Sequence, residues 1–329
     1  MSFTVAMYDK SLSEIGERLD ALALDFHLLT FDEAGRLWGN GAELSPDETE
    51  IDYVWLSARC KMDGALEKAF DLVLACKSVG VVQTFNAGLD DPYYKKISDK
   101  GTRICNSSAQ AVGISEYVLA QVMSVIHPVE DQRKLQADKQ WQVTPFREMS
   151  RTNWLIIGYG PIGQEIATRV KPFGASISVI RRTARAVENA DRVGTLADLN
   201  DFAGDADVIV LACPLNDDTR GFANKQFFSA AKQDAILVNI ARGPLIDDTA
   251  MIASLDDGRL ATAILDVFDE EPLPTDNPLW SHPKVRLTAH TSFAGEGVYP
   301  RWDRLFLDNI SCFVKGEALN YEVDPNIIV

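Results

Sequence analysis

The amino-acid sequence predicts an α/β protein with two domains, each built on a parallel β-sheet. Two series of short apolar runs, separated by segments with helical spacing, follow one another along the chain. The runs of the second series are predominantly apolar, which is typical of strands buried on both faces of a parallel sheet. With 329 residues, 46% of them hydrophobic and 24% charged, the chain is long enough to bury two cores.

The first series of strands is expected before residue 106. The predicted strands are Thr4–Tyr8, Phe26–Thr30, Tyr53–Ser57, Gly80–Phe85 and Arg103–Asn106. Ser45, Pro46 and Glu48 have the residue types of the N-cap, N1 and N3 positions, so a helix is expected to begin at Ser45.

The middle of the chain predicts a connecting helix followed by an arm. From Gly113 to about His127 the apolar residues recur at helical spacing. A polar stretch with Trp141 and Phe146 follows, and we interpret it as an arm that contacts a second copy of the chain.

A second series of strands and a last helix complete the pattern. The predicted strands are Trp154–Ile157, Ile177–Ile180, Val208–Ala212, Ile236–Ile240, Ala263–Val267 and Val285–Thr288. A helical pattern then runs from Trp302 to Phe313 and ends at Lys315-Gly316, a basic last turn followed by a glycine. We expect this helix to return to the first domain.

Charge and cysteine usage argue against several classes of protein. The formal net charge of -16 and the pI near 4.7 repel phosphate backbones and anionic lipids, so neither nucleic acid nor a membrane is an expected partner. The five cysteines form no CxxC pair, which argues against a disulfide framework or a metal site and fits a reducing cytoplasm. Residues Met1–Val5 lack the features of a leader, and no apolar stretch reaches the roughly 18 residues of a membrane helix.

A glycine-rich motif follows the first strand of the second series. It reads Gly158-Tyr159-Gly160-Pro161-Ile162-Gly163 and precedes a stretch compatible with a helix. Glycine allows a tight turn that brings the free N–H groups of a helix N-terminus against a pyrophosphate, so a side chain at Gly160 would obstruct that approach. A simple strand-to-helix turn is the alternative, but the flanking strand and helix favour a Rossmann-type dinucleotide site.

The end of the next strand favours NADP(H) over NAD(H). In NAD-binding sites an acidic residue about twenty positions after the glycine-rich motif accepts hydrogen bonds from the ribose hydroxyls. Here the strand runs instead into Arg181, Arg182 and Thr183, whose guanidinium groups can hold a 2′-phosphate through charge-assisted hydrogen bonds. A solvated basic turn is the alternative interpretation.

Three later motifs end apolar strands with chemically active residues. Arg242 follows Asn239-Ile240-Ala241, Glu271 precedes Pro272-Leu273-Pro274, and His290 follows Leu287-Thr288-Ala289. Ligands bind at the carboxyl ends of parallel strands, so these three side chains are expected to converge. Reduction of a 2-oxo acid needs a cation for the carboxylate and carbonyl, a proton donor, and a group that keeps the donor protonated, roles we assign to Arg242, His290 and Glu271. Taken singly, each residue is ordinary; together they favour catalysis.

These motifs together resemble the D-isomer-specific 2-hydroxyacid dehydrogenase family over nearly the whole chain. Asn86-Ala87-Gly88 is similar to the family loop that holds the substrate carboxylate, which implies that Ala87 and Gly88, with Arg242 and His290, bind substrate. The resemblance implies two Rossmann-like or flavodoxin-like domains with the active site in the cleft between them. The substrate domain comprises residues 1–106 and 294–329, the cofactor domain residues 107–293, and the assembly is a homodimer.

The resemblance also implies further cofactor contacts. The residues that are expected to line the cofactor cleft are Cys213, Pro214, Thr219, Ile240 and Ala241. Asp266 is expected to face the nicotinamide carboxamide. Departures from the family pattern include Arg181 at the acidic ribose position and Ala289 where proline usually precedes the histidine. The basic ribose turn and Pro278–Trp280 look most like the NADPH-dependent glyoxylate and hydroxypyruvate reductase branch, whose substrates are small 2-oxo or 2-hydroxy acids.

Two other functions remain open from the sequence. A dinucleotide-sensing binding protein, as in transcriptional corepressors of this fold, would keep the same positions without catalysis. The related formate dehydrogenase group pairs its histidine with glutamine, whereas Glu271 stands here. Loops such as Leu56–Lys61 are expected to set the choice of 2-oxo acid.

Overall fold

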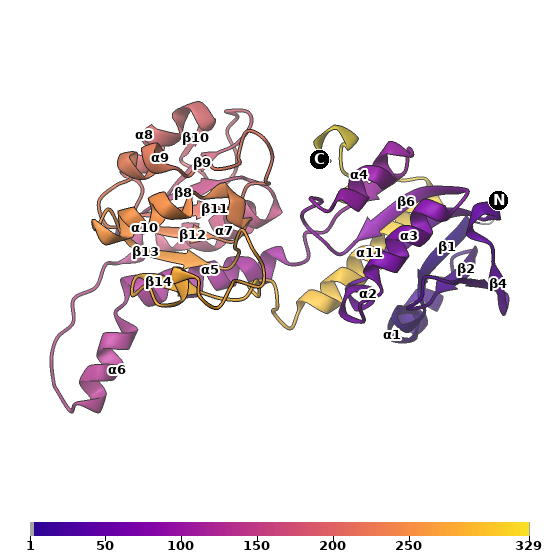
Figure 1. Ribbon diagram of the computed structural model, residues 1–329, viewed down its shortest axis with the longest axis horizontal. Helices are drawn as coiled ribbons and strands as arrows, with labels where there is room; N and C mark the ends of the chain where they lie inside the picture. The colour runs from indigo at the N-terminus through magenta and orange to yellow at the C-terminus, as the bar shows by residue number, and fades with distance from the viewer. Residues whose placement is uncertain (1–2, 329) are drawn as a thin grey trace. The chain divides into compact units, whose positions relative to one another are not determined.

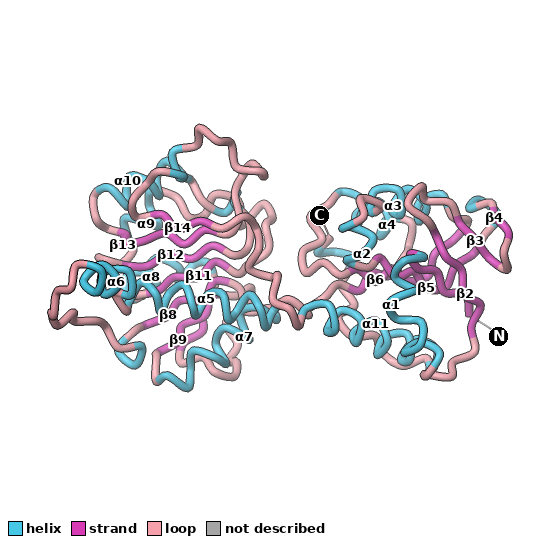
Figure 2. Tube along the Cα trace, turned by 90° about the horizontal axis from the view of Figure 1, so that it is seen from below, coloured by secondary structure: helices cyan, strands magenta, loops and turns pink. Residues whose placement is uncertain are grey.

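The computed structural model describes residues 3–328, so Met1, Ser2 and Val329 of the predicted first domain lie outside the described residues. The chain forms two compact units. The first comprises Met1–Ala109 and Glu296–Val329, and the second comprises Gln110–Gly295. Each unit holds one seven-stranded sheet, so the predicted α/β class with two parallel-dominant sheets is confirmed. Figure 2 colours the strands of each unit magenta and the helices cyan.

The first unit has seven strands in the order β4-β3-β2-β1-β5-β6-β7. The strands are β1 (Phe3–Tyr8), β2 (Phe26–Phe31), β3 (Leu37–Gly39), β4 (Ala42–Leu44), β5 (Glu50–Leu56), β6 (Ser78–Thr84) and β7 (Arg103–Cys105). The helices are α1 (Asp9–Asp20), α2 (Ala58–Met62), α3 (Leu66–Ala75), α4 (Pro92–Asp99) and α11 (Val298–Lys315). Strands β2, β1, β5, β6 and β7 run parallel, whereas β3 and β4 are antiparallel.

Alternating residues of the parallel strands send apolar side chains to both faces of this sheet. Val5 of β1 packs with Ile15 of α1 and Phe306 of α11 on one face. Ala6, its neighbour, packs on the other face with residues of α3 and α4. The last helix therefore belongs to the first unit, as expected, and it ends at Gly316, whose φ of 71° is left-handed.

One local prediction in this unit was wrong, and one hairpin was not predicted. The helix expected from Ser45 is a single 3-10 turn at Pro46–Glu48, because the Ser45 hydroxyl bonds the Asp47 carboxylate instead of capping the turn. The sequence reasoning also missed the β3–β4 hairpin. Its turn is Asn40-Gly41, with φ values of 50° and 79°, which suit a two-residue hairpin turn.

The second unit has a fully parallel sheet in the order β10-β9-β8-β11-β12-β13-β14. The strands are β8 (Asn153–Ile157), β9 (Ser176–Ile180), β10 (Arg192–Gly194), β11 (Val208–Leu211), β12 (Ala235–Asn239), β13 (Leu260–Leu265) and β14 (Val285–Leu287). The helices are α5 (Ala111–Ile126), α6 (Val129–Ala137), α7 (Pro161–Val170), α8 (Leu199–Asp205), α9 (Lys225–Ala230) and α10 (Asp248–Asp256). The short edge strand β10 was not predicted.

Helices cover both faces of the second sheet. Val118 of α5 and Ile166 of α7 pack on one face, and Phe202 of α8, Phe227 of α9 and Leu255 of α10 pack on the other. The central strands β8, β11 and β12 are buried on both faces, which explains their largely apolar sequences.

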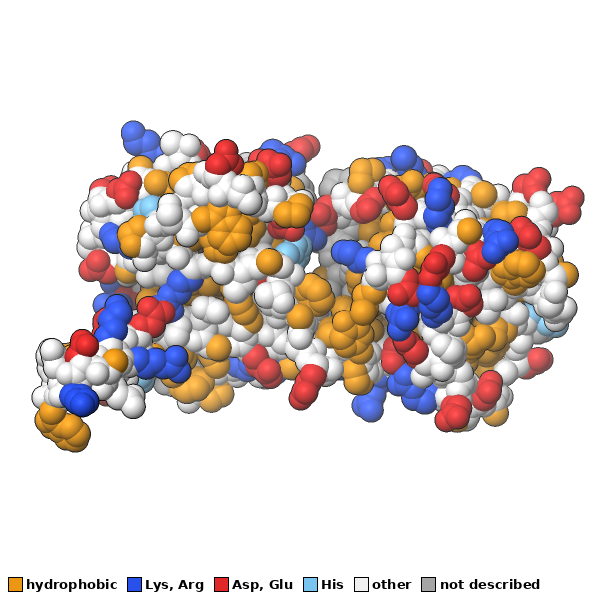
Figure 3. All heavy atoms as spheres, turned by 60° about the horizontal axis from the view of Figure 1, so that its bottom comes forward, with side chains coloured by type: hydrophobic (Ala, Val, Ile, Leu, Met, Phe, Trp, Pro, Cys, Tyr) orange, Lys and Arg blue, Asp and Glu red, His pale blue; other side chains and the backbone are white. Residues whose placement is uncertain are grey.

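An arm projects from the second unit after α5. It contains α6 and the following stretch, which lies away from the sheet in Figure 1, and Figure 3 shows apolar side chains at its end. Trp141 and Val143 are 104% and 86% exposed, while Phe146 stacks on His127 at 4.2 Å between ring centroids.

No single helix among residues 3–328 is long and apolar enough to cross a membrane. Helices α5 and α6 meet such a length and composition criterion only as a pair, bent by 54°.

Candidate active site

The glycine-rich loop lies where the chain changes direction across the second sheet. Strand β8 is flanked by β9 on one side and β11 on the other, the crevice where ligands bind in open α/β sheets. Gly158 has a φ of 99°, and a Cβ there would lie 2.5 Å from the Ala212 carbonyl oxygen and from the Cys213 nitrogen. A Cβ at Gly163 would lie 2.2 Å from the Gly158 oxygen, so both positions require glycine for packing.

Gly160 differs from the other two glycines because a Cβ there would meet no atom within 4 Å. It is exposed and is the N-cap of α7, with Pro161 at the first helical position. The space in front of the first turn of α7 is therefore open, and the N–H groups of that turn face it. These residues fit a pyrophosphate, as the motif predicts.

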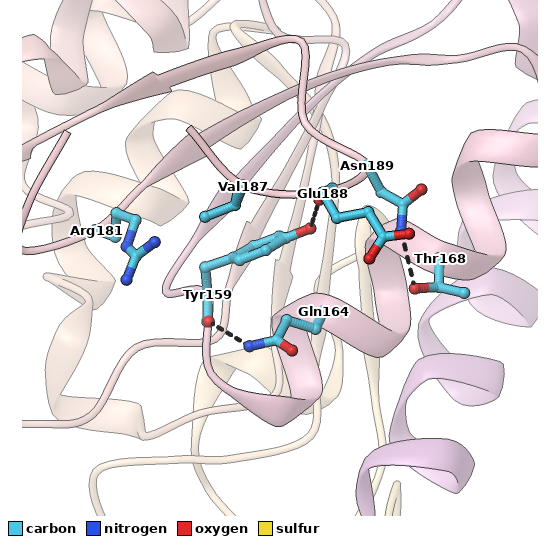
Figure 4. Close-up of a pocket in the computed structure, with 7 residues that line it drawn as sticks. All are labelled: Tyr159, Gln164, Thr168, Arg181, Val187, Glu188 and Asn189. Atoms are coloured by element: carbon cyan, nitrogen blue, oxygen red, sulfur yellow. Dashed lines mark hydrogen bonds between the residues drawn. The ribbon is translucent and has the colours of Figure 1, made fainter. Parts of the chain in front are cut away.

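A cavity of about 250 Å³ opens beside this loop (Figure 4). The residues that line it are Tyr159, Gln164, Thr168, Arg181, Val187, Glu188 and Asn189. Arg181 follows β9, and its backbone N–H donates to the Gly194 carbonyl at 3.0 Å. Arg182 and Thr183 are exposed and do not line the cavity, so among the predicted ribose-side residues only Arg181 does.

Tyr159 and Asn189 hold the segment after β9 against α7. The Tyr159 hydroxyl donates to the Glu188 carbonyl, and the Asn189 amide donates to the Thr168 hydroxyl at 3.3 Å. Burial, followed by the Glu188 charge, raises the pKa of Tyr159, so its hydroxyl stays protonated. Glu188 was not predicted as a site residue. Its carboxylate carries a negative charge in the cavity that also contains Arg181.

Arg242 follows β12 on a tightly packed loop. Asn239 is fully buried, and its amide accepts from the Ala241 N–H at 3.1 Å and donates to the Arg242 carbonyl at 2.8 Å. A Cβ at Gly243 would lie 1.9 Å from the Phe268 carbonyl carbon. The loops after β12 and β13 therefore touch, and Asn239, a polar residue ending an apolar strand, fixes the backbone beside Arg242.

His290 and Glu271 are paired in the structure. The His290 Nδ1 lies 2.7 Å from Glu271 Oε2, and Glu271 Oε1 accepts from the Phe268 N–H at 2.9 Å. Their side chains are 45% and 36% exposed, so the pair is reachable from solvent. His290 has a left-handed φ of 48°, and its N–H donates to the Asp266 carbonyl at 2.8 Å.

Asp266 directly follows β13 and is fully buried, and both of its carboxylate oxygens accept hydrogen bonds from its own chain. Its expected contact with the nicotinamide carboxamide stays a prediction. Oδ1 accepts from the Thr288 hydroxyl at 2.5 Å and from the Thr291 N–H at 2.9 Å, and Oδ2 accepts from the Ser292 N–H at 3.0 Å. The Thr288 hydroxyl also bonds Tyr117 of α5 at 2.8 Å. Asp266 thus positions the segment that carries His290.

The other predicted cofactor residues end β11 and β12. Cys213, Thr219, Ile240 and Ala241 are each less than 10% exposed, whereas Pro214 is exposed. The Thr219 hydroxyl donates to the Pro214 carbonyl at 2.8 Å and closes a tight turn. Burial raises the pKa of the Cys213 thiol to about 12, so the thiol is neutral.

Ala87 and Gly88 lie in the first unit, on the loop after β6. The Asn86 amide donates to the Tyr94 hydroxyl at 2.8 Å, and the Asn106 amide donates to the Ala87 carbonyl at 2.7 Å. Side chains on both sides thus hold the loop, which is partly exposed.

Within residues 3–328, no group of three or more His, Cys, Asp or Glu side chains could hold a metal ion.

The glycine loop at the switch point of a parallel sheet defines the second unit as a Rossmann-type dinucleotide-binding domain. Residues 119–292, more than half of the chain, match the model of the NAD binding domain of D-isomer specific 2-hydroxyacid dehydrogenases. The chain belongs to this family, whose members are oxidoreductases.

Curated relatives and solved structures are similar to this chain over most of its length. Glyoxylate/hydroxypyruvate reductase A of Klebsiella pneumoniae is 27% identical over 211 residues, 64% of this chain and 67% of the relative. An uncharacterized protein of Corynebacterium melassecola is 30% identical over 87% of this chain and 92% of its own length. The NADPH-dependent glyoxylate/hydroxypyruvate reductase of Sinorhizobium meliloti, solved with NADP and sulfate, has the same fold, with a TM-score of 0.78, 24% identity and 100% coverage of both chains.

Proposed function

We propose that this chain is an NADP(H)-dependent reductase that converts a small 2-oxo acid, similar to glyoxylate or hydroxypyruvate, to the D-2-hydroxy acid. The observation that carries the proposal is the 2.7 Å contact between His290 and Glu271. Glu271 and His290 follow β13 and β14 of the same parallel sheet in which the glycine loop follows β8 and Arg242 follows β12. A reductase needs a proton donor there, beside a cation that attracts the substrate.

Each residue of the proposed site has a separate role in carbonyl reduction. When bound, the nicotinamide supplies the hydride that the carbonyl carbon accepts. Arg242 binds the substrate carboxylate and polarises the carbonyl, and the backbone amides of Ala87 and Gly88 bind the carboxylate. His290 donates its Nε2 proton to the developing alkoxide, while Glu271 accepts from Nδ1 and so fixes the ring orientation.

The cofactor preference rests on Arg181. It lines the cavity beside the glycine loop, at the position where an acidic residue would bind the ribose of NAD. Structures of family proteins from Sinorhizobium meliloti and Xanthobacter autotrophicus contain NADP and NADPH respectively. We therefore expect NADPH to be used in preference to NADH.

Changing Glu271 to glutamine is expected to move the pH profile of reduction. The carboxylate stabilises the protonated imidazole, whereas an amide does not, so the rate should begin to fall at a lower pH as pH rises. The amide oxygen can still accept from the Phe268 N–H, which preserves the loop. Steady-state rates across pH measure the shift, with Glu270→Gln, the exposed neighbouring carboxylate, as the control. An unmoved profile would contradict the role of Glu271.

Changing Arg181 to alanine is expected to lower the preference for NADPH over NADH. A charge-assisted hydrogen bond contributes roughly 1.5–3 kcal/mol, so the ratio of kcat/KM values should fall roughly 10- to 150-fold per lost contact. Glu188→Gln should raise the ratio, because it removes a negative charge but keeps the carbonyl that Tyr159 bonds. Arg185→Ala, exposed in the same segment and outside the cavity, is the control. Equal ratios in all variants would remove Arg181 from cofactor selection.

We also propose that two copies form a homodimer through the arm, which exposes Trp141 and Val143. The molar mass from light scattering decides this, and a monomer at micromolar concentration would refute it.

The five cysteines are free thiols, four of them buried, which agrees with a reducing cytoplasm as the working compartment.

The decisive experiment follows NADPH and NADH oxidation by the purified protein with glyoxylate, hydroxypyruvate, pyruvate and phenylpyruvate. NADPH-selective turnover is expected. Cofactor binding without any turnover would instead favour the dinucleotide-sensing function, and turnover of formate would favour the formate dehydrogenase group.

A further inference from the structure

The first unit has a switch point of its own. From β1 the chain continues to β2 on one side of the sheet, while β5 lies on the other side of β1. Ligands in such sheets bind beyond the carboxyl ends of the two strands at this point. A cavity of about 90 Å³ occurs there, and we call it the switch-point cavity; its lining includes Ser11, Trp55, Ser57, Met62, Tyr299 and Trp302.

The apolar walls of the switch-point cavity are held in place. The Trp55 ring stacks on Phe306 with 4.3 Å between centroids, and Trp302 packs edge-on against Tyr299 at 5.4 Å. Trp55 and Trp302 are 3% and 6% exposed. Met62 and Tyr299 stand at the outer side, 63% and 46% exposed, with the Tyr299 hydroxyl 3.6 Å from the Met62 sulfur.

The two serine hydroxyls of this cavity are engaged with each other. The Ser11 and Ser57 hydroxyls are 2.6 Å apart, and the Ser57 oxygen also accepts from the Cys60 N–H at 3.2 Å. Such a pair tolerates an apolar neighbour, because its hydrogen-bonding groups are already partnered.

The charges around the cavity disfavour an anionic ligand. Arg59 donates to Glu14 at 2.7 Å and to Asp63 at 3.1 Å, so two carboxylates surround this guanidinium. Asp303, also in the lining, accepts from Arg18 at 2.6 Å. The charged lining residues are thus two carboxylates and one arginine, and a further carboxylate or phosphate would meet net negative charge.

The cavity adjoins the loop that we assign to the substrate carboxylate. Trp302 packs edge-on against Phe85, with 5.6 Å between ring centroids. Phe85 directly precedes Asn86-Ala87-Gly88, and β6, which leads into that loop, pairs with β5. A 2-oxo acid held by the loop therefore has an apolar cavity nearby in the same unit.

We propose that the switch-point cavity receives the substituent on the keto carbon of the 2-oxo acid and selects apolar groups of about three non-hydrogen atoms. A water molecule occupies roughly 30 Å³ in the liquid, so 90 Å³ holds about three groups of that size. This inference rests on the proposed reductase function and extends its substrates to short-chain aliphatic 2-oxo acids. Anionic substituents, as in 2-oxoglutarate, are rejected.

Three substrates test the proposal with few confounding differences. Pyruvate carries a methyl group, 2-oxopentanoate carries a propyl group, and 2-oxoglutarate replaces the terminal methyl of the propyl chain by a carboxylate. Each buried methylene raises kcat/KM roughly fourfold, so 2-oxopentanoate should exceed pyruvate by roughly tenfold or more. It should exceed 2-oxoglutarate by a larger factor.

The matched variants are Met62→Ala combined with Tyr299→Ala, which removes the outer apolar wall, and Tyr299→Phe, which keeps the ring. In the double variant the ratio between 2-oxopentanoate and pyruvate should fall to within roughly threefold, while Tyr299→Phe should retain most of it. Ile327→Ala, an exposed apolar residue of the same unit outside the lining, should leave the ratio unchanged. A ratio near one in the unmodified protein, or a ratio unaffected by the double variant, would overturn the proposal.

Direct binding separates this proposal from the proposed function. Isothermal titration calorimetry of 2-oxopentanoate into the unmodified protein and into Met62→Lys requires no turnover. If no 2-oxo acid is reduced but saturable binding is lost in Met62→Lys, the cavity assignment stands and the reductase function fails. Binding that is equal in both proteins refutes the cavity assignment, whatever the turnover.

Discussion

Replacing His290 with alanine is expected to lower kcat for 2-oxo acid reduction by roughly 10²- to 10⁴-fold, the usual contribution of a positioned general acid. The imidazole is the group that we assign to proton donation, and its Nδ1 is held by Glu271 at 2.7 Å. Alanine leaves the alkoxide to be protonated by water. The dissociation constant for NADPH should stay nearly the same, because the glycine loop is unchanged.

A second histidine of the same unit provides the control. His282 Nε2 lies 3.3 Å from the Asp256 carboxylate, so His282→Ala removes another imidazole beside a carboxylate, but one outside the predicted site. His282→Ala should keep near-normal turnover. Near-normal turnover of His290→Ala, measured at the nicotinamide absorbance, would exclude the histidine as the proton donor.

Replacing Gly160 with aspartate is expected to weaken NADPH binding by at least roughly 100-fold, since a carboxylate would occupy the space for the pyrophosphate and repel it. A Cβ at this position meets nothing within 4 Å, so the folded chain accommodates it. Gly160 is also the N-cap of α7, where aspartate is favourable. The melting temperature should therefore stay constant or rise while affinity falls.

Cofactor fluorescence titration and thermal unfolding together measure the effect of Gly160→Asp. Gly160→Ala, with a smaller side chain and no charge, should give an intermediate affinity. Undiminished NADPH binding by Gly160→Asp would mean that the pyrophosphate does not lie in front of α7.

The sequence predicted the parallel strands because burial on both faces leaves a clear signature. Val208–Leu211, for example, is fully buried and contains only apolar residues. The β3–β4 hairpin was missed although Asn40-Gly41 is a strong turn signal, because its strands are three residues long and half exposed. Short edge elements such as β10 carry too few residues for a periodic pattern.

The pairing of Glu271 with His290 was predictable because both residues belong to motifs that follow strands, whereas the assigned roles of these residues and of Arg242 stay predictions. Glu188 could not be found this way, because only the bond from the Tyr159 hydroxyl and the fold of the segment after β9 bring it to the cavity. The hydrogen bonds of Asp266 could not be predicted either, because their donors lie 22 to 26 positions later in the sequence.

The buried carboxylate of Asp266 has a consequence for the thermodynamics of substrate binding. Because hydrogen bonds to Asp266 already order Thr288, Thr291 and Ser292, the histidine between them is preorganised within the fold of the second unit. The conformational entropy of this loop is lost when the chain folds and does not have to be lost again when a ligand arrives. Affinity for small acids can therefore arise from few contacts.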